Sequence, residues 1–455
     1  MKKAAMLLTM LFIAAFLRAE EITIDNFIQT AVKNDPAFQE ILADMAQIKY
    51  SKALALPAED LILSVKGQYG FSADTGETGA QTTDISLSKL FLPAGTRLNA
   101  DYSIITAGSS NSGGQSSFHA YISQPLAENA FGSADRMLAE IQDYAMETAE
   151  YQTIEAYEEY LASIIKLYFS WYSNHAALKA AEAALKESNN LIDNITEKKE
   201  AGIAYEMDVN KARLQNINRK ENLIRIKQQY TESENLIKTA LRTGNNITPS
   251  DPGIYNNSKI PSEINEDRIY EKSRTKKILE LLSKKAGVSE ARAFNSLLPG
   301  VDMTAGYKTD GSGAFLRAPA EHTYYTGFRI DFPVPFSGRN RAEFETAKLE
   351  KHKTELRLNR DSLSLAASLS SVFSEIQSGR KIAELAKEKH EIALKILNDE
   401  KQYFNRTRSS FNSLIDAVNA AEDARFREIT ARMNLNNSIL DFMRLSDTLV
   451  KELKP

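Results

Sequence analysis

The chain repeats one structural pattern, and this internal repeat constrains its fold more than any other feature. Each half runs from a helical segment through strands of alternating polarity to two long helices joined by a tight turn. Asp208 and Asp416, at the two turns, are 208 residues apart, and Pro125 and Pro335, before the long helices, are 210 apart. Such agreement over half a chain indicates a duplicated unit. We therefore expect repeat 1 at 20–242, a linker at 243–263 and repeat 2 at 264–455.

The N-terminus has the features of a secretory signal peptide. Lys2 and Lys3 precede an apolar run over 4–17, and Ala19 is a plausible cleavage point, so we assign 1–19 to the signal. The run is too short for a stable transmembrane helix, and no later stretch is long and apolar enough. The chain has no cysteine, which excludes disulfides and attachment of lipid to a lipoprotein cysteine. We expect an exported, unlipidated protein.

Several segments alternate apolar and polar residues with period two. The clearest are 61–71, 97–104, 301–308 and 327–334, and weaker examples are 84–91 and 117–124. Such strands belong either to a soluble sheet over a core or to a transmembrane barrel. Their length, their aromatic content and the export signal favour the barrel. One chain offers only four to six strands, whereas the smallest such barrels need about eight, so several copies must contribute.

Repeat 1 contains an additional hairpin-like pair. About 32 more residues separate its proline markers than separate those of repeat 2, and they include 84–91 and 96–104 around Pro93. Two interpretations stay open. The pair is either a hairpin at the outer surface or an additional part of the barrel wall.

Two stretches predict unusually long helices. Neither 133–200 nor 339–409 contains a proline. At ~1.5 Å per residue, each would extend roughly 100 Å. Apolar residues recur at coiled-coil spacing in the second stretch, at Ile382, Leu385, Ile392, Ile396 and Tyr403. This seam fits helices that pack side by side in the wall of a tube, and it equally fits an ordinary antiparallel coiled coil.

Composition argues against nucleic-acid binding and catalysis. The net charge is -4, so the chain lacks the basic character that phosphate backbones attract. The five histidines have no metal-ligand spacing, and no catalytic or nucleotide-binding motif occurs. We expect no enzyme activity, no metal and no cofactor.

Taken together, the residues resemble the TolC-type outer-membrane efflux protein family over essentially the whole mature chain. The most specific motifs are the two helix turns, Gly202 to Asp208 and Ser410 to Asp416, although Ser410 stands where glycine is usual. Gln124-Pro125-Leu126 and Pro335-Phe336-Ser337 resemble the junctions that precede the long helices. The resemblance implies a mainly α fold with a transmembrane β part: a long α-helical coiled-coil barrel joined to a trimeric outer-membrane β-barrel.

The resemblance also implies function and partners. Members of the family are homotrimers that receive substrates from a periplasmic adaptor and an inner-membrane pump or secretion ATPase, with four strands from each subunit in the lipid of the outer membrane. Adaptor docking at the helix tips is implied for Gly202, Ile203, Ala204, Asp208, Ser410, Phe411 and Ser413. A gate and selectivity region at the periplasmic mouth is implied for Asp416, Asn419, Asn412, Arg406 and Arg408.

A second hypothesis of a different class is kept. Periplasmic adaptors and coiled-coil scaffolds also have export signals and long helical hairpins, but they conduct nothing. The two hairpins and the absence of cysteine favour the duct, because adaptors usually have one hairpin and often a lipid-anchoring cysteine.

Overall fold

The computed structural model describes residues 20–71, 78–106, 114–312, 319–332, 338–406 and 409–450. The predicted signal peptide 1–19, the junction 335–337 and Arg408 lie outside the described residues. The chain forms two compact units, and each repeat contributes to both. The helical unit comprises the described parts of Met1–Asp44, Thr153–Arg274 and Ser362–Pro455, and the sheet unit those of Met45–Gln152 and Thr275–Asp361.

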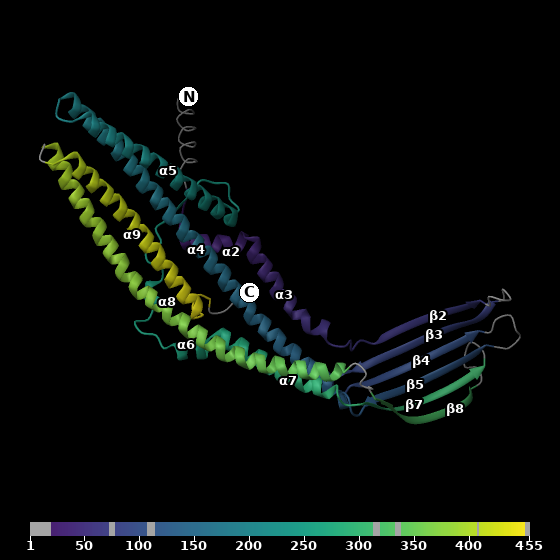
Figure 1. Cartoon of the computed structure of the whole chain (residues 1–455). Coiled ribbons are helices and arrows are strands. Elements are labelled where there is room, and N and C mark those ends of the chain that lie inside the picture. The colour runs from purple at the N-terminus through teal and green to yellow at the C-terminus, as the bar shows by residue number, and fades with distance from the viewer. Residues whose placement is uncertain are drawn as a thin grey trace, which may run out of the picture. The chain divides into compact units, whose positions relative to one another are not determined.

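One antiparallel sheet of six strands dominates the sheet unit (Figure 1). The strands are β2 (Ile62–Phe71), β3 (Thr78–Phe91), β4 (Thr96–Thr106), β5 (Gln115–Pro125), β7 (Gly300–Ser312) and β8 (Pro319–Asp331), hydrogen-bonded in that order. The pair predicted at 84–91 and 96–104 therefore lies within the sheet, between β2 and β5. The sheet of one chain therefore has six strands, whereas the family resemblance implies four strands from each subunit, and the added hairpin is hydrogen-bonded to the sheet on both sides.

The two faces of the sheet differ in polarity, as the alternation predicts. Apolar side chains that share one face are strongly exposed; they include Leu63, Val65, Ile85, Leu87, Leu98, Ile122, Met303, Phe328 and Ile330. The opposite face is mostly polar. An exposed apolar sheet face of this extent requires an apolar surrounding.

Helices connect the sheet to the rest of each repeat. α3 (Pro36–Ala55) starts with proline at its first position, and the Asp35 carboxylate accepts a hydrogen bond from the Ala37 N–H at 3.0 Å. The corresponding helix of repeat 2 is α7 (Arg274–Asn295). The two long helices are α4 (Ser133–Glu200) and α8 (Arg339–Asn405). Within the described residues, no helix is both long and apolar enough to cross a membrane.

In the helical unit, α4 and α8 each turn back into a second helix. The partners are α5 (Glu206–Leu241) and α9 (Phe411–Leu445). A core of large side chains, including Trp171, Tyr168 and Phe27, holds α2 (Ile24–Asn34) against α4. The predicted linker 243–263 contains β6 (Ile247–Pro249), which pairs in parallel with β1 (Glu20–Ile22), and is followed by α6 (Glu266–Lys272).

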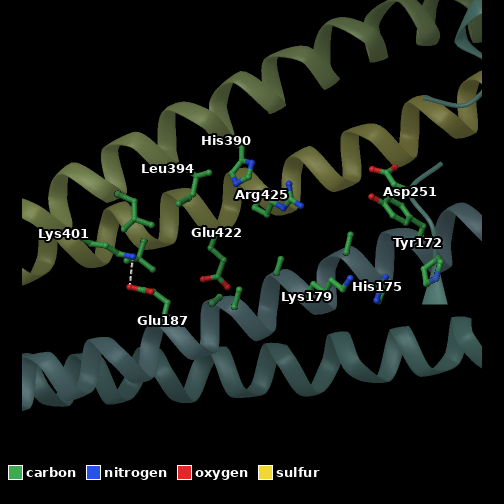
Figure 2. A pocket seen from close by; sticks show the side chains of 18 of the residues that line it. Tyr172, His175, Lys179, Glu187, Asp251, His390, Leu394, Lys401, Glu422 and Arg425 are labelled. Carbon is green, nitrogen blue, oxygen red and sulfur yellow. Dashed lines mark ion pairs between the residues drawn. The ribbon is translucent and has the colours of Figure 1, made fainter. Parts of the chain in front are cut away.

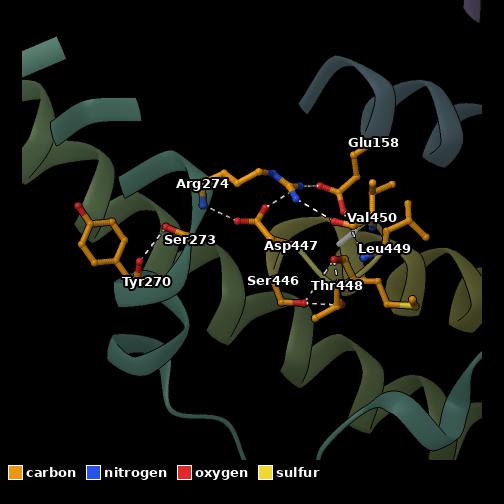
Figure 3. Close-up of polar contacts among 10 residues, drawn as sticks. Glu158, Tyr270, Ser273, Arg274, Ser446, Asp447, Thr448, Leu449 and Val450 are labelled. Carbon is orange, nitrogen blue, oxygen red and sulfur yellow. Dashed lines mark hydrogen bonds and ion pairs between the residues drawn. The ribbon is translucent and has the colours of Figure 1, made fainter. Parts of the chain in front are cut away.

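A buried ion cluster joins three segments of the helical unit (Figure 3). The Arg274 guanidinium contacts the carboxylates of Glu158, on α4, and of Asp447, after α9, the latter at 3.0 Å. The second Glu158 oxygen accepts hydrogen bonds from the N–H groups of Leu449 and Val450 at 3.2 and 3.1 Å. Because a buried charge without a partner is costly, this cluster fixes the C-terminal segment on α4.

Candidate functional site: the helix tips and the mouth of the tunnel

The first helix turn is shaped by Gly202. The Ile203 N–H donates to the Lys198 carbonyl at 2.8 Å, and Gly202 adopts a φ of +74°, the left-handed conformation that commonly ends helices. Asp208 begins the next helix: its carboxylate accepts a hydrogen bond from the Tyr205 N–H at 3.2 Å. A carboxylate at this position satisfies an N–H group that the helix itself leaves unpaired.

Apolar side chains project from this tip. Ile203, Tyr205 and Met207 are each exposed by more than half, with Tyr205 at 77%. Ala204 is half-buried. Tyr205 and Met207 were missed by the sequence analysis, which followed the glycine-to-aspartate spacing. The sequence does mark these two residues, because they are large apolar side chains within a turn between two polar helices.

The second turn is built differently. The Ser410 hydroxyl accepts a hydrogen bond from the Ser413 N–H at 3.1 Å, so Ser410 caps the start of α9. Gly202 instead ends a helix, so the two positions matched by the sequence motif have different structural roles. Ser410 and Ser413 are exposed. Phe411 is buried, and its ring lies 5.9 Å from the ring of Phe404.

Three of the residues assigned to the mouth, Asn412, Asp416 and Asn419, lie on the first turns of α9. Asp416 is exposed, and Asn412 accepts a hydrogen bond from the Lys211 ammonium, on α5, at 3.1 Å. Arg406 is exposed beyond the end of α8. The basic partner of Asn412 is thus a lysine of the other hairpin, which the sequence analysis did not identify.

Arg219 makes a largely buried polar contact between the two hairpins. Its guanidinium, only 6% exposed, donates to the Glu422 carboxylate and to the Asn419 side-chain oxygen, both at 3.0 Å. Arg219 lies on α5, and its two partners lie on α9. No sequence signal marks this contact, because the partners are about 200 residues from Arg219.

A groove of about 660 Å³ lies between α4 and the hairpin of α8 and α9 (Figure 2). Its walls combine small residues of α4, such as Ala180 and Ala183, with charged side chains of both hairpins. Across it, the Lys401 ammonium lies 2.7 Å from the Glu187 carboxylate. Burial lowers the pKa of His175, at the far end, below its usual value. The two hairpins are therefore not closely packed here, and individual polar contacts connect them across the groove.

Two helices carry apolar stripes that nothing covers within the described chain. On α8 the stripe comprises Ile382, Leu385, Ile392, Ile396 and Tyr403, each between 47% and 62% exposed. On α5 it comprises Leu214, Ile217 and Ile224, between 52% and 70% exposed. The predicted seam of α8 thus faces outward from the subunit. Among the described residues, no group of three or more histidines and carboxylates is placed to hold a metal ion.

The described chain thus combines paired helical hairpins with a sheet whose apolar face is exposed. Residues 278–445 match the family model named outer membrane efflux protein. Over this segment the chain is similar to outer-membrane efflux proteins. A search of curated protein sequences finds no match.

Solved structures of outer-membrane proteins share the fold. The outer membrane protein VceC of Vibrio cholerae is 12% identical with a TM-score of 0.70, over 93% of this chain and 95% of that one. The CmeC outer membrane channel of Campylobacter jejuni is 14% identical with a TM-score of 0.70, over 93% and 85%. The open state of the MtrE outer membrane channel of Neisseria gonorrhoeae is 14% identical with a TM-score of 0.68, over 94% and 90%.

Proposed function

We propose that three copies of this chain form one duct, with the sheets in the outer membrane and the helical hairpins in the periplasm. A periplasmic adaptor and an inner-membrane pump or secretion ATPase deliver the substrate, and the duct conducts it passively. The observation that carries this proposal is the set of apolar surfaces that a single subunit leaves exposed.

Each exposed surface has a specific cover in this arrangement. Lipid covers the apolar face of the sheet, and the neighbouring subunit covers the stripes on α5 and α8. The unpaired backbone groups of the edge strands β2 and β8 find partners in the next subunit, which a strand in lipid requires. A monomer would satisfy none of these requirements.

The contacts between α5 and α9 hold the mouth closed in this proposal. Arg219, Glu422 and Asn419 form a local, partly buried polar link that can break without unfolding either hairpin. The groove beside it gives the helices room to move. Opening therefore requires α9 to separate from α5 near the tips, and Asp416 from three subunits then lines the aperture.

The helix tips are the docking surface for the adaptor. Gly202, Ile203 and Ala204 form the first tip with Tyr205 and Met207, and Ser410 and Ser413 form the second. Exposed apolar side chains next to exposed polar side chains suit the tip of another helical hairpin. Asp208 and Phe411 act here by holding the shape of the two turns.

The purified protein in a planar lipid bilayer tests conduction directly. We expect discrete single-channel currents after the detergent-extracted protein has inserted into the bilayer, and none without it. A periplasmic scaffold or adaptor would leave the membrane in high salt and would produce no channels. That result would contradict the duct and favour the scaffold.

A further inference from the structure

The hairpin of β3 and β4 is fully integrated in the hydrogen-bonded sheet. β3 pairs with β2 from Ile62↔Ser88 to Phe71↔Thr78, and β4 pairs with β5 from Arg97↔Ser123 to Ile105↔Gln115. Both strands have at least the ~9–11 residues that a tilted transmembrane strand needs. The hairpin is therefore long enough to cross the membrane with its neighbours.

Rows of like side chains run through the hairpin without interruption. One apolar row crosses four strands through Val65, Ile85, Tyr102 and Phe118. The adjacent polar row crosses all six strands, through Lys66, Asp84, Ser103, Ser117, Asp310 and Glu321. If the hairpin of β3 and β4 lay outside the barrel wall, both rows would be interrupted. The polar Asp84 and the apolar Ile85 would then no longer face water and lipid respectively.

The turn of the hairpin is fixed to the end of the sheet where α4 begins. Gly95 and Gly132 both have positive φ, and a Cβ built on Gly95 would lie 2.8 Å from the Gly132 nitrogen. The Gln124 amide donates to the Ala94 carbonyl at 2.9 Å, and the Thr96 hydroxyl donates to Gln124 at 2.6 Å. Only glycine permits so close a backbone contact in this conformation, so the turn is a built part of the wall.

The strand order also allows closure between subunits. Successive strands from β2 to β8 run in opposite directions, so β8 of one copy meets β2 of the next in antiparallel orientation. Outer-membrane barrels generally have an even number of antiparallel strands. Six strands from each subunit meet this condition.

We infer that the trimer closes an 18-stranded barrel, with β3 and β4 of every subunit as wall strands, in place of the twelve-stranded barrel that four strands per subunit would give. This inference rests on the proposed trimeric duct. Because barrel diameter grows roughly in proportion to strand number, the lumen is about 1.5 times as wide. With strands ~4.8 Å apart and tilted ~40°, the backbone radius is about 18 Å.

The lumen of this barrel is wide, polar and slightly acidic. Its charged strand residues in each subunit are Lys66, Arg97, Lys308 and Arg329 with Asp84, Asp101, Asp302, Asp310, Glu321 and Asp331. Several are paired, such as Arg329 with Asp302 at 2.7 Å. Barrels of this size enclose an aqueous channel. The membrane part of the duct therefore suits bulky hydrated solutes.

Disulfide trapping tests the position of the hairpin, since the chain has no cysteine of its own. Two double variants detect β3 and β4 in the barrel wall, because each joins cross-strand partners: Val65→Cys with Ile85→Cys, and Ala100→Cys with Ala120→Cys. A third double variant, Val65→Cys with Phe118→Cys, detects the alternative in which β3 and β4 leave the wall and β2 lies beside β5. In the six-stranded sheet these residues are three strand spacings apart, ~14 Å, too far for a disulfide.

The variants are oxidised in outer membranes after trimer assembly has been verified on gels. We expect the first two pairs to form intrachain crosslinks in most subunits and the third to form none. Crosslinking of the third pair without the first two would overturn the 18-stranded barrel while the trimeric duct stands. Absence of the trimer would instead contradict the proposed function.

Accessibility of neighbouring residues on β4 gives a second readout. In the wall, Leu98→Cys faces lipid and Asn99→Cys faces the lumen. A water-soluble thiol reagent should label the Asn99 variant and leave the Leu98 variant unmodified. Equal labelling of both would place the hairpin outside the membrane and overturn the inference.

Discussion

Arg219 on α5 donates a hydrogen bond of 3.0 Å to the side-chain oxygen of Asn419 on α9, and the same guanidinium pairs with Glu422. The family resemblance places Asn419 where some members carry an acidic residue at the mouth. In this chain the position instead engages a buried arginine of the neighbouring hairpin. Asn419, which the resemblance implies for selectivity, is therefore also part of the Arg219 contact that we propose closes the tunnel.

Replacing Arg219 with alanine should favour the open mouth. Hydrogen bonds to charged groups contribute about 1.5–3 kcal/mol, so losing this link should raise the open-to-closed ratio roughly tenfold or more. Single-channel recordings should show longer or larger openings. Arg219→Lys, which keeps the charge and one donor, should have a smaller effect. Unchanged openings in the alanine variant would show that this contact does not restrain the mouth.

Asp416 should control ion selectivity at the same aperture. Asp416 is exposed in one subunit, and the proposed trimer would bring three of these carboxylates together, where they would attract cations. Asp416→Ala should reduce the preference for cations measured from reversal potentials in a salt gradient, whereas Asp416→Glu should preserve it. Identical reversal potentials in all three proteins would exclude Asp416 from the conducting path.

Gly202 allows a backbone test of adaptor docking. A Cβ at this position meets nothing within 4 Å, so only the φ of +74° opposes a substitution. Gly202→Val should cost about 1–2 kcal/mol locally and distort the tip, while Gly202→Asn tolerates the conformation. We expect cells with the valine variant to lose the drug resistance that depends on the adaptor, while the trimer stays assembled. Equal resistance in both variants would argue against docking at this turn.

The apolar stripe on α8 should be needed for assembly. Ile392→Glu places a charge in the proposed subunit interface and should reduce the trimer fraction strongly at equal protein concentration, measured by size and mass in detergent. Lys387→Glu is the matched control, since this exposed residue lies ~140° around the helix from Ile392. A stable Ile392→Glu trimer would mean that the stripe faces something other than a subunit.

The buried cluster around Arg274 predicts a pH dependence of stability. Burial raises the pKa of Glu158 to about 7 from 4.5, although Arg274 opposes the shift. The folded state therefore holds this proton more tightly than the unfolded state. The stabilisation is complete below pH 4.5 and is lost as the pH rises through 7, on the order of 3 kcal/mol in total.

Trp171, the only tryptophan and fully buried, reports unfolding of the helical unit by its fluorescence. Denaturant titrations at pH 5 and pH 8 should give a higher free energy of unfolding at pH 5. Glu158→Gln should remove most of the difference, because the amide does not titrate. A wild-type stability that rises between these pH values would contradict the raised pKa.

Much of the fold could be predicted because it depends on local patterns. Period-two alternation locates the strands, and proline, glycine and capping residues locate the helix ends, as at Pro36 and Gly202. The place of the added hairpin could not be predicted, because alternation fixes which face a residue occupies but not which strand lies beside it. The register Val65↔Ile85 is a property of the assembled sheet.

The site shows the same limit. The turns were identified from their motif, yet the motif matched Gly202 with Ser410, which end and begin a helix respectively. Arg219 was not identified, because an arginine on a polar helix has no signal until its partner is known. The exposure of the predicted seam on α8 depends likewise on which helix lies opposite.

Single-particle imaging of the detergent-extracted protein tests the central claim most directly. The account predicts particles with threefold symmetry, a detergent belt around the sheets and a long helical tube with a constricted end. Separate helical rods, or monomers that remain in solution without detergent, would contradict the trimeric outer-membrane duct.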